Sequence, residues 1–419
     1  MAPWVDTWTH RMGKVSPNES PSRAAGAAIA HQLEAAGCVA YFAGGCVRDE
    51  LLGELPLDYD VATSALPDQI RELFPGARGV GEHFGVMLVR QGGQTIEVST
   101  FRKEGAYVDG RRPEHVSFTT DEVADANRRD FTINGIFKHP ATGKIIDHFG
   151  GEKDLKARVL RAIGDPDARL SEDRLRLLRA VRFTARFHMT IDPATEQAIA
   201  RHAPELRGVS RERVGHEVRR MLTHATRAKA VHLLESLGLA SATLLEPPCA
   251  NVGSRVASLP ADASFSCALA AWLLDRGMAL PWQERVRQWT KALVLSNHER
   301  DELAATLRAR ETLMGDWSKL GVAKRKRVAS DHGFTDAMMV LRCESPQIAD
   351  RIEIDLAPLR ASGLAPTPLL DGDILQQIGM RPGPHFRSIL DGVYDAQLEG
   401  RITTLEQAKA LARANPTNL

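Results

Sequence analysis

The stretch from Tyr41 to Thr63 reads YFAGGCVRDELLGELPLDYDVAT, and the rest of the chain is organised around it. An apolar, strand-like segment leads into Gly44 and Gly45, and a helical segment and a second strand follow. Asp58 and Asp60 stand two residues apart in that second strand, so we expect their side chains on one face. Two adjacent carboxylates repel each other unless cations bind between them, which is how a two-metal phosphoryl-transfer site is built.

The glycine pair and Arg48 complete a pattern for binding phosphate. Because they lack Cβ atoms, Gly44 and Gly45 let backbone N–H groups approach an anion at the start of the next helix. Arg48 falls in the first turn of that helix, where a guanidinium can bind phosphate through two hydrogen bonds. Each element alone has an ordinary explanation as a tight turn or a solvated strand edge. Their ordered combination is rarer, and GGCVRDELLG followed by DYD resembles the class II tRNA nucleotidyltransferase and bacterial poly(A) polymerase branch of the nucleotidyltransferase superfamily.

Length and composition indicate a helix-rich chain of two to four domains. The 419 residues exceed one compact core, and 43% of them are hydrophobic while only 5% are aromatic. The resemblance implies an α/β nucleotidyltransferase head with a small mixed sheet in residues 1–165. An all-α neck (166–224), body (225–345) and tail (346–419) are expected to follow, with the base-reading helix in the neck and the tail on the tRNA acceptor arm.

Cysteine usage and hydropathy bear on the location of the protein. The five cysteines are scattered, without CxxC or zinc-ligand spacing, so we expect free thiols in a reducing cytoplasm. There is no basic leader before an apolar segment and no apolar run of about 18 residues, so neither export nor a membrane span is predicted. The net charge is +1, so any surface for nucleic acid must come from local clusters of basic residues.

Two later segments are expected to complete the catalytic end. Glu97 lies in the strand-like run Thr95–Phe101, which should lie beside the strand of the two aspartates. The resemblance implies that this glutamate helps to hold the metal ions. Residues 102–118 combine glycines, a proline and dense mixed charge, so they predict a loop. The resemblance implies a flexible loop that helps to switch base preference, and the residues that match it are Tyr107, Asp109, Arg111 and Arg112.

The segment NRRDFTINGIF, at residues 127–137, can be surface charge before a buried apolar run. The resemblance implies instead that it contacts the sugar and triphosphate of a nucleotide. Asp130 and Asn134 would then bind ribose hydroxyls, while Arg128 and Arg129 would bind phosphates.

A helix is expected to begin at Ser171, with Glu172 and Asp173 in its first turn and Arg176 one turn further. The spacing is compatible with ordinary helical salt bridges. The resemblance implies a nucleobase reader, because Glu172, Asp173 and Arg176 match its motif EDxxR. Cytosine and adenine both present an amino donor beside a ring-nitrogen acceptor, so a carboxylate and a guanidinium would select CTP and ATP against UTP and GTP. We expect Asp173 and Arg176 to contact the base and Glu172 to orient the arginine.

Arginine is enriched between Arg158 and Arg220, where no lysine occurs. Arg179 and Arg182 follow the base-reading motif on the same helix, so we assign them to the nucleotide site. Other arginines of this segment would meet the phosphates of an acceptor RNA.

The resemblance thus implies a template-independent RNA nucleotidyltransferase that adds CCA, or its final A, to tRNA 3′ ends. Its partners would be tRNA, ATP and CTP, its cofactor would be Mg²⁺ on Asp58 and Asp60 with help from Glu97, and it would act as a monomer or homodimer. An enzyme that adds only the final A and a poly(A) polymerase are the alternatives. A non-catalytic RNA-binding protein on the same fold is a further alternative, and the intact aspartates, glycines and Arg48 argue against it.

Overall fold

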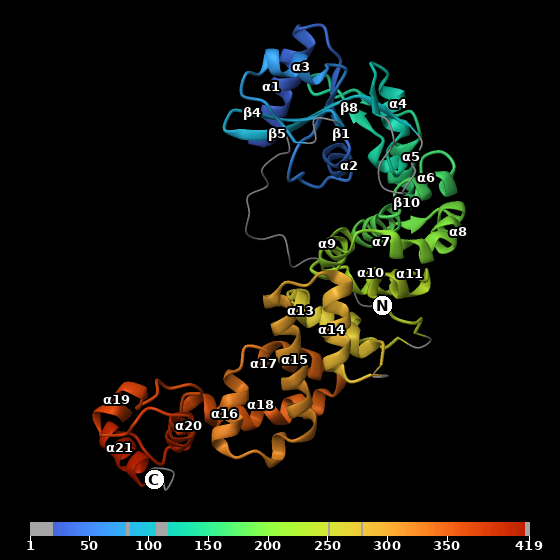
Figure 1. Cartoon of the computed structure of the whole chain (residues 1–419). Coiled ribbons are helices and arrows are strands. Elements are labelled where there is room, and N and C mark those ends of the chain that lie inside the picture. Colours follow the sequence, from blue (N-terminus) through green and yellow to red (C-terminus); the bar gives the residue numbers. More distant parts are fainter. Residues whose placement is uncertain (1–19, 81–83, 106–115, 250–251, 278–279, 415–419) are drawn as a thin grey trace. The chain divides into compact units, whose positions relative to one another are not determined.

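The computed structural model describes residues 20–80, 84–105, 116–249, 252–277 and 280–414. These residues divide into two compact units (Figure 1). The first comprises the described residues up to Glu217 together with His232–Glu246, and the second comprises Val218–Val231 and the described residues from Pro247 onward. The division into head, neck, body and tail stays a prediction. The cysteines are free thiols, as expected, and none of the described helices combines the length and apolar character needed to cross a membrane.

A seven-stranded mixed sheet forms the centre of the first unit, in the order β3-β4-β5-β2-β1-β8-β9. Neighbouring strands are antiparallel except β2 and β5, which are parallel, so the expected small mixed sheet is confirmed. The strands of this sheet are β1 (Ala40–Ala43), β2 (Val61–Thr63), β3 (Arg78–Gly79), β4 (Val86–Gln91), β5 (Gln94–Thr100), β8 (Phe137–Lys138) and β9 (Ile145–Ile146). A separate parallel pair is formed by β10 (Val159–Leu160) and β11 (Thr190–Ile191).

Helices surround this sheet and continue beyond it. They are α1 (Pro21–Ala35), α2 (Gly45–Leu51), α3 (Pro67–Leu73), α4 (Glu122–Asn127), α5 (Gly151–Ala157), α6 (Pro166–Glu172), α7 (Arg176–Arg186), α8 (Pro193–His202) and α11 (Leu239–Leu244), with the 3₁₀ helices η3 (Thr132–Asn134) and η4 (Ala203–Gly208). The segments shared by both units are α9 (Arg211–Leu222) and α10 (Arg227–Ser236).

The hairpin of β4 and β5 brings Glu97 towards the aspartate segment. Gly92 and Gly93 form its turn with φ angles of 55° and 77°, and a two-residue hairpin turn with both φ angles positive is one that glycine adopts without strain. Val98 of β5 pairs with Val61 of β2, so Glu97 lies one residue before the point where β2 begins. The expected neighbourhood of these two strands is confirmed.

The expectation of a loop throughout residues 102–118 is wrong at both ends of that segment. There β6 (Arg102–Glu104) pairs antiparallel with β7 (Val116–Phe118). Pairing satisfies the backbone N–H and C=O groups of both segments, so dense charge does not prevent a short ribbon. The predicted loop residues Tyr107, Asp109, Arg111 and Arg112 lie outside the described residues.

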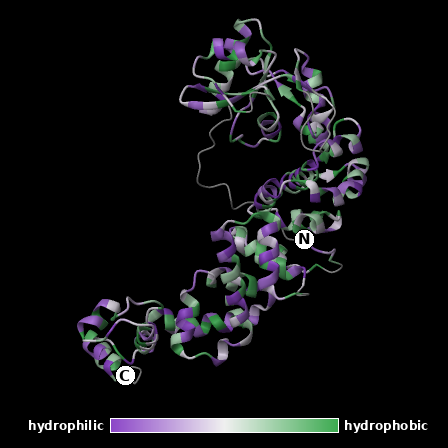
Figure 2. Ribbon diagram, viewed as in Figure 1, coloured by the Kyte–Doolittle hydropathy of each residue, from purple (hydrophilic) through white to green (hydrophobic). Residues whose placement is uncertain are grey.

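Every regular element described in the second unit is a helix, in agreement with the expected all-α part, and its helices carry both hydrophilic and hydrophobic residues (Figure 2). They are α12 (Arg255–Ser258), α13 (Phe265–Asp275), α14 (Trp282–Leu293), α15 (Asn297–Gly315), η5 (Trp317–Lys319), α16 (Val322–Ser330), α17 (Phe334–Glu344), α18 (Pro346–Ala361), α19 (Gly372–Gln377), α20 (His385–Leu398) and α21 (Leu405–Arg413).

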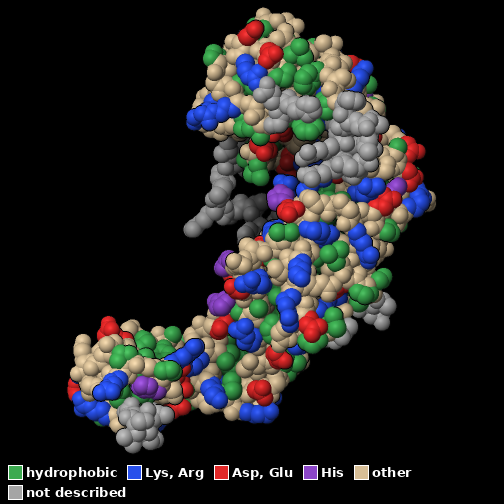
Figure 3. Space-filling model, in the orientation of Figure 1, with side chains coloured by type: hydrophobic (Ala, Val, Ile, Leu, Met, Phe, Trp, Pro, Cys, Tyr) green, Lys and Arg blue, Asp and Glu red, His purple; other side chains and the backbone are tan. Residues whose placement is uncertain are grey.

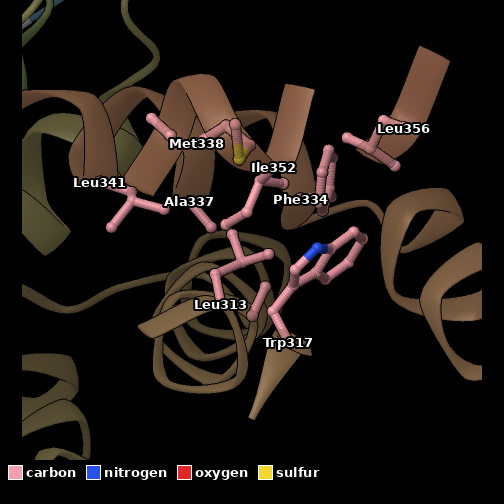
Figure 4. Packing of buried hydrophobic residues seen from close by; sticks show 10 residues of the cluster. Leu313, Trp317, Phe334, Ala337, Met338, Leu341, Ile352 and Leu356 are labelled. Atoms are coloured by element: carbon pink, nitrogen blue, oxygen red, sulfur yellow. The ribbon is translucent and has the colours of Figure 1, made fainter. Parts of the chain in front are cut away.

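One core of the second unit forms where α15, η5, α17 and α18 meet (Figure 4). Trp317, Phe334, Leu341 and Ile352 are buried in it. The only polar side-chain atom of Trp317 donates a hydrogen bond of 3.1 Å to Asp355, so the indole is buried without an unsatisfied donor. Apolar burial of this kind holds the helices together.

Basic side chains recur over the helices of the second unit in the view of Figure 3, with acidic side chains among them. Some arginines of this unit are paired with acidic residues of the same unit. Arg327 of α16 lies 2.6 Å from Asp395 of α20, and Arg255 of α12 lies 2.5 Å from Glu344 of α17. Such pairs join neighbouring helices of the unit.

Candidate active site

Asp58 and Asp60 lie just before β2 and not within it, which corrects their expected place in a strand. β1 ends at Ala43, whose N–H donates a hydrogen bond of 3.1 Å to the carbonyl of Asp60, and the chain then turns into α2 at Gly44. No backbone of β1 therefore continues opposite Asp58. Burial still alternates along the segment, because Tyr59 is buried while Asp58 is exposed and Asp60 is half-buried.

The electrostatics of these carboxylates favour a cation. The pKa of Asp60 is raised to about 7, first by burial and then by the charges of Glu97 and Asp58. Burial and the charge of Asp58 also raise the pKa of Glu97. This donor set fits a hard divalent cation, because oxygen ligands of like charge are stabilised by one. Within the described part of the chain, no three acidic, histidine or cysteine side chains are already gathered closely enough to enclose an ion.

The glycine turn lies against Arg129. Gly44 precedes α2 with a φ of 70° and a ψ of −120°, a conformation that favours glycine. A Cβ atom at Gly44 would lie 3.1 Å from Nη1 of Arg129, so the missing side chain leaves room for the guanidinium beside the turn. The charge of Arg129 partly opposes the rise in the pKa of Asp60 that burial and the two other carboxylates cause. Arg129 therefore interacts with the expected metal site as well as with the expected phosphate turn.

Arg48 is buried, and its guanidinium is used inside the protein. Nε and Nη2 donate to Oδ1 of Asp49 at 2.8 and 2.6 Å, and Nη1 donates to Oδ1 of Asn134 at 2.6 Å. The rings of Phe183 on α7 and of Phe187, the residue after that helix, lie 5.1 and 4.6 Å from its central carbon. These contacts connect α2 to α7. The phosphate contact expected of Arg48 stays a prediction, as does that of Gly45, whose Cβ position would lie 3.7 Å from Arg48.

Asp125 was missed by the sequence reasoning, and it holds both arginines of the NRRD segment. Its side chain is buried, and Oδ1 accepts a hydrogen bond of 2.8 Å from Arg128 while Oδ2 accepts one of 2.9 Å from Arg129. Both charges lower the pKa of Asp125 against the effect of burial, which raises it. Its position three and four residues before the arginines was the available signal, because side chains at this spacing meet on a helix.

Asp130 and Asn134 are buried beside each other. Asn134 donates a hydrogen bond of 2.9 Å to Asp130, and Arg179 donates one of 2.7 Å to the other oxygen of the same carboxylate. Burial alone would raise the pKa of Asp130, but the charge of Arg179 and the bond from Asn134 hold it at about 2. The structure thus brings together three predicted site residues. Their predicted contacts with a nucleotide are not tested by these bonds.

The EDxxR motif does not lie in the first turn of one helix, which corrects the expectation. α6 already begins at Pro166 and contains Ser171 and Glu172, so Ser171 is not an N-cap. Asp173 then has an extended backbone, with a φ of −139° and a ψ of 102°, and α7 begins three residues later. The physical reason is an earlier start signal, because Asp165 caps the first turn of α6 and proline is favoured at the first helical position.

The three motif residues nevertheless meet at the junction of α6 and α7. Glu172 accepts a hydrogen bond from Nη1 of Arg176, which is the contact that an orienting role requires. Nη2 of Arg176 donates to the carbonyl of Arg128 at 2.9 Å, so the motif lies against the NRRD segment. Asp173 accepts a bond of 2.7 Å from Arg213 on α9.

Arg182 bonds a residue that does not belong to the predicted site. It is buried, and its Nε donates a hydrogen bond of 2.6 Å to Glu217 on α9. It therefore supports α7 from the side of α9. Its expected contact with a nucleotide stays a prediction.

A mixed sheet with a glycine turn and neighbouring acidic residues, followed by helices, defines the class of nucleotidyltransferases with a poly(A) polymerase-type head. Residues 40–161 match the poly(A) polymerase head domain, and residues 188–247 match a domain described as the probable RNA and SrmB-binding site of polymerase A.

Whole-chain relatives place the protein more narrowly. The CCA-adding enzyme of Geobacillus kaustophilus is 33% identical over 387 residues, which are 89% of this chain and 92% of that enzyme. The chain therefore belongs to the CCA-adding enzyme family. The enzyme of Geobacillus stearothermophilus is 43% identical over 211 residues, 50% of this chain, and this match spans only about half, 52%, of the relative's length. The crystal structure of the Bacillus stearothermophilus CCA-adding enzyme in complex with CTP is 28% identical with a TM-score of 0.77, over 95% of this chain and 98% of that one.

Proposed function

We propose that this chain adds CCA, or its terminal A, to the 3′ end of tRNA in the cytoplasm, using CTP, ATP and Mg²⁺. The observation that carries the proposal is the group of interacting carboxylates, Asp58 and Asp60 before β2 with Glu97 on β5, in the same unit as the Glu172–Arg176 junction. The family name of the relatives and the CTP complex of one of them support it.

Asp58 and Asp60 would hold Mg²⁺, with Glu97 as a third oxygen donor. The chemistry available with Mg²⁺ bound is a lowered pKa of the RNA 3′-hydroxyl and neutralisation of the leaving pyrophosphate. The carboxyl of Asp60 has to be ionised to serve as a ligand, and its pKa of about 7 means that this ionisation and cation binding are coupled near neutral pH. Arg129, beside the Gly44 turn, would orient phosphates.

Base selection would occur at the junction of α6 and α7. A guanidinium has five N–H donors, and Arg176 uses three of them for Glu172 and the carbonyls of Arg169 and Arg128. These bonds fix the plane of Arg176, and one of the two remaining donors would bond the ring nitrogen. Each carboxylate oxygen accepts two hydrogen bonds, so Asp173 can receive the amino group of cytosine or adenine while it is held by Arg213.

The test uses the full chain with Mg²⁺, labelled CTP or ATP, and tRNA transcripts that end before CCA, after C or after CC. We expect nucleotide addition to all three. Addition to the CC-ended transcript alone would mean an enzyme that adds only A, and long tails on unstructured RNA would mean a poly(A) polymerase. Asp58→Asn is the control, because Asp58 is exposed and its substitution should leave the fold intact. No addition by the wild-type chain to any RNA would refute the proposal.

A further inference from the structure

Tyr59, the residue between the two site aspartates, is anchored in the interior. Its side chain is 1% exposed, and its ring lies 4.9 Å from that of Phe42 on β1. Its hydroxyl donates a hydrogen bond of 2.6 Å to Oε1 of Glu50 on α2. The Tyr59 side chain therefore supplies a hydrogen bond as well as apolar packing.

Glu50 is the centre of a cluster that we call the Glu50 clamp, made of Arg23, Glu50, Tyr59 and Lys138. The Glu50 side chain is 7% exposed, Oε2 accepts a bond of 2.6 Å from Lys138 on β8, and Oε1 accepts one of 3.2 Å from Arg23 on α1. Burial alone would raise the pKa of Glu50, but the bonds from Lys138 and Tyr59 lower it. The carboxylate is therefore charged, and it joins α1, α2 and β8 to Tyr59.

The aspartate segment has little backbone support of its own. Residues 54–60 lie in neither a helix nor a strand, and the bond from Ala43 to the carbonyl of Asp60 joins their last residue to β1. The interior side of the segment is closely packed, because a Cβ atom on Gly26 of α1 would lie 2.9 Å from the Phe42 ring and 3.6 Å from Cβ of Tyr59. The position of Tyr59 thus constrains the backbone at Asp58 and Asp60 on either side of it.

We propose that Tyr59 and Glu50 are positioning residues for the cation site, which set the placement of the Asp58 and Asp60 carboxylates. Burial alternates at Asp58, Tyr59 and Asp60, so fixing Tyr59 in the interior limits the positions that the side chains of the two aspartates can take. The clamp resists the repulsion between these carboxylates before a cation binds. This inference rests on the metal site proposed above, and it assigns the Glu50 clamp no contact with RNA or nucleotide.

Tyr59→Phe is the sharpest variant, because it removes one oxygen atom and leaves the ring. Glu50 keeps its bonds from Lys138 and Arg23, so the fold should persist. Tyr394→Phe is the matched control, since the Tyr394 hydroxyl donates a comparable bond of 3.0 Å to the carbonyl of Pro366 in the second unit. Glu50→Gln is the second variant, and it keeps the shape of the side chain while removing its charge.

The first measurement is Mn²⁺ binding to the full chain without RNA or nucleotide. The electron paramagnetic resonance signal of free Mn²⁺ reports how much of the ion remains unbound. We expect about three- to tenfold weaker binding in Tyr59→Phe and no change in Tyr394→Phe, because supporting residues around metal ligands commonly alter affinity by about tenfold or more. Asp58→Asn serves as the reference for a chain that has lost the proposed metal site.

The second measurement is the Mg²⁺ dependence of nucleotide incorporation. Tyr59→Phe should need more Mg²⁺ for half-maximal rate, excess Mg²⁺ should restore that rate, and the KM for CTP should stay unchanged. General destabilisation would not be rescued by metal in this way.

The outcomes separate the two proposals. Wild-type Mn²⁺ affinity in folded Tyr59→Phe overturns the positioning role and leaves the metal site standing. Equal Mn²⁺ binding by the wild-type chain and Asp58→Asn overturns the metal site and the positioning role together. If Tyr59→Phe does not fold, as judged by circular dichroism, the same measurement on Glu50→Gln decides.

Discussion

Nη1 of Arg48 donates a hydrogen bond of 2.6 Å to Oδ1 of Asn134, although 86 positions separate the two residues in the sequence. Asn134 passes the connection on to Asp130, which is bound by Arg179 of α7. Helix α2, which follows the glycine turn, and helix α7, which begins at Arg176, therefore belong to one buried polar network. A substitution of Arg48 should therefore affect the contacts of both α2 and α7.

Arg48→Lys should destabilise the first unit although it keeps the charge. Lysine cannot reproduce the planar fork that bonds Asp49 and Asn134 while lying against Phe183 and Phe187. We expect a loss of about 2–4 kcal/mol in the free energy of unfolding, measured by urea denaturation, because a buried charge loses part of its partners. Arg186→Lys is the control, since Arg186 is more exposed and its nearest acidic oxygens lie 3.7 Å or more away. Equal losses in both variants would contradict the network.

Asp125→Asn should raise the KM for CTP and ATP by a similar factor, about tenfold, because both arginines lose a charged partner that orients them. Discrimination against UTP should persist, since the Glu172–Arg176 junction is not changed. Steady-state kinetics with each nucleotide measures both quantities. Asp121→Asn is the control, because asparagine can replace aspartate as the N-cap of α4. An unchanged KM in Asp125→Asn would rule out the orienting role.

Asp173→Ala should weaken the choice of nucleotide more than it weakens RNA binding. The expected result is incorporation of UTP or GTP that the wild-type chain excludes, with RNA affinity in a gel-shift assay within about threefold of wild type, since phosphate contacts dominate that affinity. Asp167→Ala removes a half-exposed carboxylate of α6 that is paired with Arg201, and it serves as the matched control. The base-reading assignment fails if UTP and GTP stay excluded while the variant is folded.

The stabilising effect of the Asp130 carboxylate should depend on pH in a defined direction. Its folded pKa of about 2 lies below the ordinary value of 3.8, so the charged form is favoured by folding. The contribution is complete above pH 3.8 and is lost as the pH falls towards 2. Asp130→Asn should therefore lower the melting temperature at pH 7 by several degrees, and the difference from wild type should shrink below about pH 4. A difference that grows towards low pH would contradict the salt bridge with Arg179.

Local patterns predicted much of the fold and part of the site. The strand-like run Thr95–Phe101 indicated the strand beside the aspartate segment, and the Gly44 turn with its acidic neighbours indicated the head. These predictions succeeded because backbone freedom at glycine and side-chain alternation act over a few residues. Because these signals act over only a few residues, they also explain the errors. Ser171 and the two acids after it form a local start signal for one helix, but the chain uses the earlier signal at Asp165 and Pro166 and interrupts the helix at Asp173.

The sequence by itself determined which chemical groups are present: adjacent carboxylates before a short strand, a glycine turn, and an acid and an arginine suited to cytosine and adenine. Only the tertiary structure decided what each group faces. Buried Arg48 bonds Asn134 and lies against two phenylalanine rings. Asp125 bonds two arginines, and the Tyr59 hydroxyl bonds Glu50. Such pairings join residues far apart in the chain, and they arise because buried charges and hydroxyls must find partners wherever the fold brings them together.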